Sequence, residues 1–172
     1  MEERPVHFSD NFTIRPATAE DVPAILSLVR GLAAYEKMES ACVATEAGLK
    51  EWIFDKGKAE AVIGEAAGRV VGFALFSGSF STFLAKPGIY LENLFVIPEM
   101  RGRGYGKRLL QYLAKLVVSR GYGRLEWVCL DWNKPSIDFY LSLDAVRQNE
   151  WTTYRLAGDA LDALAEANLD RT

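Results

Sequence analysis

The chain has 172 residues, of which 49% are hydrophobic and 25% are charged, and its formal net charge is −3 at pH 7. This length and composition suit one domain with a core large enough to fold without disulfides. The negative balance argues against a nucleic-acid partner, and no window is apolar enough to span a bilayer, so no membrane partner is expected.

The scarcity of histidine and cysteine narrows the possible chemistry. His7 is the only histidine, which argues against a Ser–His or Cys–His triad and against a histidine-based zinc site. Cys42 and Cys129 are too few for a disulfide framework, and no metal is expected. The first ten residues lack the apolar centre of a secretion signal, so a cytoplasmic location is expected. An enzyme of this composition must transfer protons with carboxylates, tyrosine or water.

The first third of the chain predicts a strand and two helices. Residues 1–11 are interpreted as an N-terminal tail. The segment "FTIRPAT" alternates like a short strand and ends at Thr18, an N-cap candidate with Asp21 three residues later. Apolar residues then recur with helical period to about residue 36, and a second, shorter helix is expected after Thr45.

The middle of the chain is rich in strand signals. Two β-rich runs meet at Ala67-Gly68, which predicts a hairpin, and "GIYLENLFVIP" predicts a further strand that Pro98 closes. Residues 104–120 place their leucines on one face and are therefore predicted to be a helix, which Gly121 ends.

The last third predicts a strand, a short helix and a final strand. "GRLEWVCL" has the composition of a strand, Asn133 is expected to cap a helix with Pro135 in its first turn, and "EWTTYRLA" predicts the last strand. Residues 158–172 are expected to form a helical tail. The order β-α-α-β-β-β-α-β-α-β predicts a single α/β domain with a mixed sheet over residues 12–157.

The stretch "ENLFVIPEMRGRGYGKRLLQYL" joins a strand to a helix through a glycine-rich loop. Free backbone N–H groups and the positive end of the helix dipole meet at such a loop, which predicts a pyrophosphate cradle. A nucleotide-triphosphatase loop is excluded because Arg101 and Arg108 occupy the positions of its first glycine and its Ser or Thr. A dinucleotide fingerprint would need glycine in place of Lys107. A connection with solvated basic residues is the structural alternative.

The same stretch resembles the acetyl-CoA motif of the GNAT superfamily of N-acetyltransferases. More narrowly, "IRPAT", "LAAYEKME", "YLENLFV" and "WNKPSIDFY" resemble the diamine (spermidine/spermine) and thialysine acetyltransferase group. The resemblance covers residues 12–157, with the motifs in the right order. It implies a mostly antiparallel central sheet flanked by helices, acetyl-CoA as cosubstrate, and a homodimer formed through the late strands and helix.

The resemblance also implies how acetyl-CoA is held. In that superfamily a bulge splays the strand before the loop, so that its backbone pairs with the pantetheine arm, and the loop wraps the pyrophosphate. The residues expected to bind the cofactor are Leu94, Phe95, Val96, Arg101, Gly102, Arg103, Gly104, Tyr105, Gly106, Lys107, Asn133, Ser136 and Tyr140.

Glu92 is the candidate for the catalytic base. In an alternating strand its side chain shares a face with Leu94 and Val96, so it is expected in an apolar neighbourhood where a carboxylate needs a partner, a water or a substrate cation. The resemblance implies that Glu92 contacts the substrate amine, often through water, and helps to deprotonate it. The alternative is a structural carboxylate paired with an arginine.

Tyr140 is the candidate for the catalytic acid. It follows Asn133 by seven residues, which is two helical turns, so both side chains lie on nearly the same face. The resemblance implies that this tyrosine gives a proton to the departing thiolate, whereas Asn133 and Ser136 touch CoA. The structural alternative is an aromatic core pair with Phe139.

The acceptor side is expected to be acidic. The resemblance implies that Tyr35 and Glu36, and with them Glu92 and Glu150, line a channel for an amine, although acidic clusters are often only solvated surface. The stretch "SFSTFLAKPGIY" departs from the polyamine enzymes, which carry an acidic, tryptophan-containing segment there. A shorter amine, such as a diamine or a lysine analogue, therefore stays open.

The sequence thus predicts an acetyl-CoA-dependent transfer to a primary amine of a small molecule, by direct transfer in a ternary complex. Two alternatives stay open. One is a protein lysine or N-terminal acetyltransferase, and the other is a CoA-binding module without catalysis. The presence of both Glu92 and Tyr140 argues against the second alternative.

Overall fold

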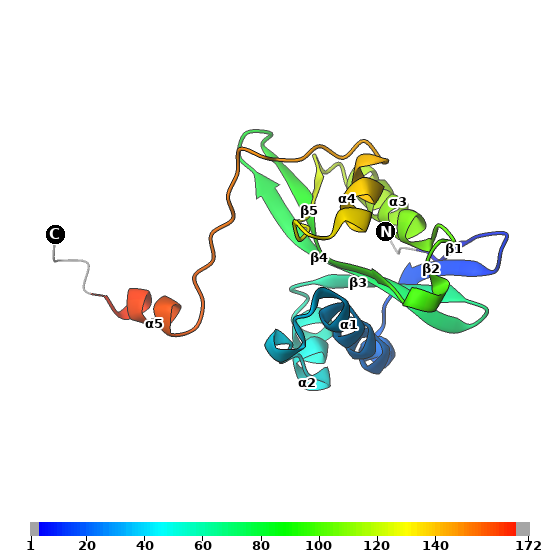
Figure 1. Cartoon of the computed structure of the whole chain (residues 1–172), viewed down its shortest axis with the longest axis horizontal. Coiled ribbons are helices and arrows are strands. Elements are labelled where there is room, and N and C mark those ends of the chain that lie inside the picture. The colour runs from blue at the N-terminus through cyan, green and yellow to red at the C-terminus, as the bar shows by residue number, and fades with distance from the viewer. Residues whose placement is uncertain (1–3, 168–172) are drawn as a thin grey trace. The chain divides into compact units, whose positions relative to one another are not determined.

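The computed structural model of the chain describes residues 4–167, which fall into two units, residues 4–128 and 129–167. The first unit contains a six-stranded sheet in the order β1 to β6 (Figure 1). Its strands are β1 (Val6–His7), β2 (Phe12–Pro16), β3 (Glu60–Ala66), β4 (Arg69–Ser81), β5 (Lys86–Val96) and β6 (Leu125–Glu126). Neighbours are antiparallel except β5 and β6, which are parallel. The predicted mixed, mostly antiparallel sheet is confirmed.

Helices cover both faces of this sheet. The elements are α1 (Val22–Glu36), α2 (Glu46–Leu49) and α3 (Tyr105–Ser119), with short 3-10 turns η1 (Ala19–Asp21), η2 (Glu39–Ala41) and η4 (Pro98–Met100) and a π-helix η3 (Lys50–Asp55). Figure 1 shows α1 and α2 on one side of the sheet and α3 on the other. None of the helices within residues 4–167 combines the length and the apolar content needed to cross a membrane.

The start of α1 follows from local hydrogen bonds. The Thr18 N–H donates to Asp21 Oδ2 at 2.7 Å, which satisfies a donor that the helix start leaves free. The Asp21 carboxylate also accepts two bonds from the Arg15 guanidinium, at 2.7 Å each. The predicted capping pair is confirmed, and the arginine on β2 ties it to the sheet.

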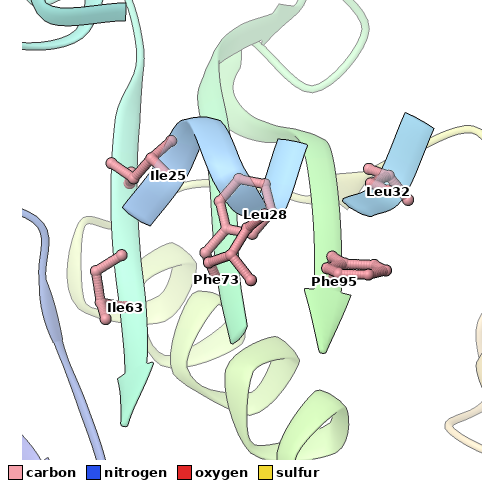
Figure 2. Close-up of a cluster of buried hydrophobic side chains, with 7 residues drawn as sticks. Ile25, Leu28, Leu32, Ile63, Phe73 and Phe95 are labelled. Carbon is pink, nitrogen blue, oxygen red and sulfur yellow. The ribbon is translucent and has the colours of Figure 1, made fainter. Parts of the chain in front are cut away.

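The core between α1 and the sheet is built from aliphatic and aromatic side chains. Figure 2 shows Ile25, Leu28 and Leu32 of α1 above Ile63, Phe73 and Phe95 of three adjacent strands. All six are buried, and burial of each such side chain contributes about 1.5–3 kcal/mol. This core fixes the end of α1 over β5.

The opposite face packs on α3. Leu109 and Leu113 of this helix are fully buried, as expected from the leucine spacing. At the first turn of α3, the Tyr105 ring stacks on Phe12 with centroids 4.1 Å apart and planes 3° from parallel. The start of α3 is therefore held by the sheet.

The N-terminal segment contains a strand where the sequence predicts a tail. Val6 pairs with Ile14, and His7 Nδ1 lies 3.0 Å from Thr13 Oγ1. This short β1 covers part of the edge of β2 that would otherwise be unpaired.

The second unit contains α4 (Lys134–Leu141) and α5 (Asp159–Glu166), the latter within the predicted helical tail. The predicted strand "EWTTYRLA" is wrong for this structure, since residues 151–157 form no strand and the Trp151 and Tyr154 side chains are exposed. A strand needs a neighbour to accept its backbone bonds, and residues 129–167 supply none. The strand predicted over residues 123–130 is confirmed only at Leu125–Glu126.

Candidate functional site

A bulge in β5 lies at the proposed base. Leu75 pairs with Asn93, but the next residue of β4, Phe76, pairs with Leu91, so Glu92 is an extra residue without a partner on β4. Such a bulge bends a strand and reorients the side chain that it inserts. The sequence resemblance implies a bulge in this strand, and the register locates it.

The bulge changes the environment of Glu92. The sequence places its side chain beside Leu94 and Val96 in apolar surroundings, whereas the structure has it exposed. The alternation predicted for a regular strand fails because the inserted residue shifts the pleat by one. No arginine of residues 4–167 forms an ion pair with Glu92, so the structural alternative considered for this carboxylate is not realised within that range.

Beyond the bulge, β5 has an open edge. The parallel strand β6 pairs only with Ile89 and Tyr90. From residue 91 to residue 96, no described strand lies on that side of β5. The two strands therefore separate at the point where the candidate motif begins.

Two residues of β5 direct their backbone toward this open edge. The Ile97 N–H donates to the Val71 carbonyl at 2.9 Å, which makes them a hydrogen-bonded pair of the antiparallel ladder. Because such pairs alternate, the Phe95 backbone bonds to β4, whereas the N–H and C=O groups of Leu94 and Val96 face away from it. Of the three residues predicted to pair with a ligand, Leu94 and Val96 therefore direct their backbone groups toward the open edge, where the Val96 carbonyl already accepts a hydrogen bond from Arg101 Nε at 2.9 Å. Phe95 contributes its ring to the core.

The glycine turn leads from this edge into α3. Gly102 and Gly104 have φ values of 75° and 78°, a left-handed conformation that favours glycine. A Cβ at either position, or at Gly106, would meet no atom within 4 Å, so the backbone is accessible. The first free N–H groups of the 15-residue α3 lie here, where the helix dipole is positive. The turn can accept an anion.

The four cations of the turn have different surroundings. Arg108 Nη1 donates to both carboxylate oxygens of Asp10, at 2.7 and 2.9 Å, and so anchors the N-terminal hairpin. Arg101 donates a hydrogen bond to the Val96 carbonyl of β5 and lies over the Tyr35 ring of α1. Arg103 and Lys107 are exposed, and no hydrogen bond or ion pair of theirs is found within residues 4–167. They are the cations that can approach a ligand without breaking a contact.

The amine side predicted from the sequence lies at the end of α1. Tyr35 and Glu36 are its last two residues, and Lys37 ends the helix in a left-handed conformation with φ 59°. Burial raises the pKa of the Glu36 carboxyl above its ordinary value. The Arg101 guanidinium lies over the Tyr35 ring, 4.6 Å from its centroid. The structure thus brings Tyr35 to the glycine turn.

The remaining predicted residues belong to the second unit. Asn133 is buried, and its Oδ1 accepts the Ser136 N–H at 3.3 Å, which confirms the predicted N-cap of α4. Tyr140 lies near the other end of α4, with its ring 5.2 Å from that of Phe139. Glu150 is exposed in a turn and is followed by no strand. Asn133, Ser136 and Tyr140 share one helix, whereas Glu150 does not belong to it.

Metal-binding side chains do not gather in the described part of the chain. Within residues 4–167, no three His, Cys, Asp or Glu side chains form a group that could hold a metal ion. Cys42 and Cys129 are each half-buried and do not form a disulfide with each other.

Comparison with known protein families identifies the family to which this chain belongs. Residues 30–144 match the model of the Acetyltransferase (GNAT) family. The chain belongs to the GNAT acetyltransferase family. It is 32% identical to L-ornithine N5-acetyltransferase of Arabidopsis thaliana, over 91% of this chain and 89% of that protein. It is 34% identical to thialysine N-epsilon-acetyltransferase of Caenorhabditis elegans, over 91% and 98%.

Solved structures support the fold of this GNAT enzyme. An integron cassette protein from the mobile metagenome of V. cholerae matches with a TM-score of 0.78 and 23% identity, over 91% of this chain and 99% of that one. An aminoglycoside acetyltransferase from an uncultured soil metagenomic sample, solved with trehalose, matches with a TM-score of 0.73 and 18% identity, over 87% and 99%. At these identities the likeness establishes the shared fold. The predicted fold class and family are confirmed.

Sequence reasoning missed the contacts that separate the four cations of the turn. Nothing in "MRGRGYGKR" indicates that Arg108 pairs with Asp10, 98 residues away, or that Arg101 turns back onto Tyr35. The segment "HFSDNF" contains two phenylalanines and an aspartate, with which an arginine can form cation–π contacts and an ion pair, but nothing in it indicates which arginine.

Proposed function

We propose that this GNAT enzyme transfers an acetyl group from acetyl-CoA to a primary amine of a small molecule, by direct transfer in a ternary complex. The observation that carries the proposal is the open edge of β5, which runs through the backbone of Leu94 and Val96 into the glycine turn and the start of α3. An extended, amide-bearing pantetheine arm ending in a diphosphate is complementary to such an edge and turn.

Backbone groups bind the coenzyme in this proposal. The Leu94 backbone and the Val96 N–H would pair with the pantetheine arm, since the Val96 carbonyl is bonded to Arg101. The N–H groups of residues 102–107 would hold the diphosphate, with Arg103 and Lys107 adding charge. Tyr105 takes part through its backbone alone, because its ring is buried against Phe12. Asn133 and Ser136, at the start of α4, contact CoA as the resemblance implies.

The chemistry uses one base and one acid. The amine must lose a proton before it attacks, since an alkylammonium has a pKa near ~10.4. Glu92 accepts that proton, directly or through water, and the neutral amine then attacks the thioester carbonyl to form the N–C bond. As the C–S bond breaks, Tyr140 gives its phenolic proton to the departing thiolate, and the second proton of the attacking nitrogen passes, directly or through water, to the resulting phenolate. The position of Glu92 at the bulge, exposed beside the open edge, supports its role.

The acceptor is proposed to be a short amine. Tyr35 and Glu36 bind its cationic end, and Glu150 is a further candidate for this contact. The relatives named thialysine and ornithine acetyltransferases act on primary amines of amino acids, which favours an acceptor of this class. A polyamine is the second candidate, because spermidine/spermine N(1)-acetyltransferase-like protein 1 of Homo sapiens is 30% identical over 88% of this chain and 23% of that protein.

An amine panel tests the proposal. The full chain is incubated with acetyl-CoA and thialysine, ornithine, putrescine, spermidine, or lysine-containing and N-terminal peptides, and free thiol release is followed. We expect turnover with one or more small amines and little with peptides. Turnover with peptides alone would move the assignment to a protein acetyltransferase. Coenzyme binding without turnover of any amine would favour a CoA-binding module.

Two further expectations complete the proposal. The enzyme acts in the cytoplasm, where acetyl-CoA and free amines are both available, and it works as a homodimer. The dimer is supported by the resemblance and by the exposed Trp151 and Tyr154 side chains of the second unit.

A further inference from the structure

Arg101 makes contacts that the other cations of the glycine turn do not make. Its Nε–H donates to the Val96 carbonyl at 2.9 Å, on the open edge of β5. Its guanidinium carbon lies 4.6 Å from the centroid of the Tyr35 ring and 5.3 Å from that of Phe95. Both distances fall within the range of cation–π interaction, and a planar guanidinium is suited to stacking on rings.

These contacts join three elements at one point. Val96 ends β5, Tyr35 lies in the last turn of α1, and Arg101 begins the glycine turn. The α1 backbone is already close to β5, because a Cβ at Gly31 would lie 3.0 Å from the Phe95 ring. The Arg101 side chain links this end of α1 to β5 through its contacts with Tyr35 and the Val96 carbonyl.

The contacts of the Arg101 guanidinium differ from those expected of a side chain that binds phosphate. Arg101, Arg103 and Lys107 are all exposed, but only Arg101 of these three has contacts within residues 4–167, with the Val96 carbonyl and with the rings of Tyr35 and Phe95. The resemblance stated from the sequence groups Arg101 with the residues that wrap the pyrophosphate, and the contacts of its side chain favour another role.

We propose that Arg101 is a positioning residue that holds Tyr35, and with it the amine-binding end of α1, against the coenzyme edge of β5, and that its side chain is not a phosphate ligand. This inference rests on the proposed function, because it assumes that the amine meets α1 and the coenzyme meets β5. It predicts that loss of the Arg101 side chain raises the KM for the amine and leaves the Kd for CoA nearly unchanged.

The test compares coenzyme affinity with amine KM in matched variants. CoA binding is measured by calorimetry, and KM and kcat are measured at saturating acetyl-CoA with thialysine, ornithine and spermidine, using the amine that the wild type turns over fastest. The variants are Arg101→Ala, Arg101→Lys and, as the control from the same turn, Arg103→Ala. Thermal unfolding of each variant verifies folding.

We expect Arg101→Ala to raise the amine KM about tenfold or more and to change the CoA Kd by less than about threefold. Arg101→Lys should fail to restore the KM, because an ammonium lacks both the planar group and the Nε donor. Arg103→Ala should show the opposite pattern, with weaker CoA binding and an unchanged amine KM. In a double-mutant cycle, Tyr35→Leu should add little to Arg101→Ala, since both remove the same contact.

A weaker CoA affinity in Arg101→Ala that Arg101→Lys restores, with an unchanged amine KM, would identify a phosphate ligand and overturn the inference. So would variants that leave both quantities unchanged, or fully additive effects in the cycle. Failure of the wild type to bind CoA at all would instead overturn the proposed function, so the two failures are distinguishable.

Discussion

Glu36 is the carboxylate of the proposed amine site whose environment changes its acidity. Burial raises the pKa of this group above 4.5. Its ionised form is needed to attract an ammonium, so its contribution to amine binding is present at neutral pH and is lost as the pH falls through the raised pKa. The amine KM should therefore rise on the acid side, earlier than for an ordinary carboxylate.

Replacement of Glu36 tests this. Glu36→Gln should raise the amine KM about tenfold at neutral pH, because a hydrogen bond to a charged group is lost, and should remove the acid-side rise. The measurement is the pH profile of KM for the best amine of the panel. Glu39→Gln, an exposed carboxylate beyond the end of the same helix, is the matched control and should leave the profile unchanged. An unaltered profile in Glu36→Gln would exclude the role.

Tyr140 carries the second prediction at the residue scale. Tyr140→Phe keeps the ring beside Phe139 and removes the phenolic hydroxyl group, which carries the proton. We expect kcat to fall about 10²-fold or more, with the CoA Kd changed by less than about threefold. Steady-state kinetics and calorimetry measure the two quantities. Tyr154→Phe, whose ring is 90% exposed, is the control. Acetyl transfer at the wild-type rate in Tyr140→Phe would refute the acid assignment.

The position of β5, and with it the position of its open edge, depends on how closely β4 packs against the other side of this strand. A Cβ at Gly72 would lie 2.8 Å from the Phe95 carbonyl oxygen and 3.1 Å from Val96 Cγ2. The backbone of β5 must move to relieve such a contact, and this is the strand that supplies the proposed coenzyme-binding groups. A glycine is therefore required at this position.

Gly72→Ala should lower the free energy of unfolding by about 1–3 kcal/mol and weaken CoA binding as well, because the shift displaces Leu94 and Val96. Urea denaturation and calorimetry measure the two effects. Gly78→Ala is the matched control on the same strand, since a Cβ there meets no atom within 4 Å. Equal stability and affinity in the two variants would contradict the packing described here.

The junction of β2 and α1 gives a pH-dependent stability. Hydrogen bonds from Arg15 hold the pKa of the Asp21 carboxyl below its ordinary value of 3.8. A carboxyl with a lowered pKa in the folded state stabilises it above the unfolded-state pKa, and this contribution is lost as the pH falls through the lowered value. Part of the acid denaturation of the protein should therefore come from Asp21.

Asp21→Asn should lower the free energy of unfolding at neutral pH by about 1–3 kcal/mol and should flatten its decline in acid. Urea denaturation across the acid range measures both. Asp138→Asn is the control, because its pair with Lys134 is exposed and should contribute less than about 1 kcal/mol. If Asp21→Asn were as stable as the wild type at neutral pH, the Arg15–Asp21 pair would not stabilise the folded state as described.

At the scale of the whole molecule, the proposed homodimer makes a prediction about the second unit. Trp151 and Tyr154 are 72% and 90% exposed. Exposed aromatic side chains of this size are typical of interaction surfaces. We expect the wild type to sediment as a dimer, and the double variant Trp151→Ala, Tyr154→Ala to shift toward monomer. Sedimentation velocity over a concentration series measures this, and a stable wild-type monomer would end the proposal.

The fold was predictable from the sequence to the extent that local patterns determine it. The apolar period of α3, the Thr18–Asp21 cap and the hairpin at Ala67-Gly68 all depend on neighbouring residues. The family followed from several motifs in order. Each of these features depends on residues a few positions apart, which a single sequence displays directly.

The rest of the site depends on contacts between distant segments. The bulge at Glu92 is a property of the pairing between β4 and β5, so the alternation of β5 alone predicted the wrong surroundings for this carboxylate. The Arg101–Tyr35 contact joins residues that only the fold brings together. The final strand was overpredicted because "EWTTYRLA" has strand composition but lacks a partner strand in its unit.

A crystal structure of the full chain with CoA tests the central claim most directly, namely that backbone groups at the open edge of β5 and in the glycine turn bind this coenzyme. We predict that the diphosphate lies against the N–H groups of residues 102–107 and that the pantetheine arm pairs with Leu94 and Val96. Phosphates bound elsewhere on the protein, or an arm that does not follow β5, would contradict it.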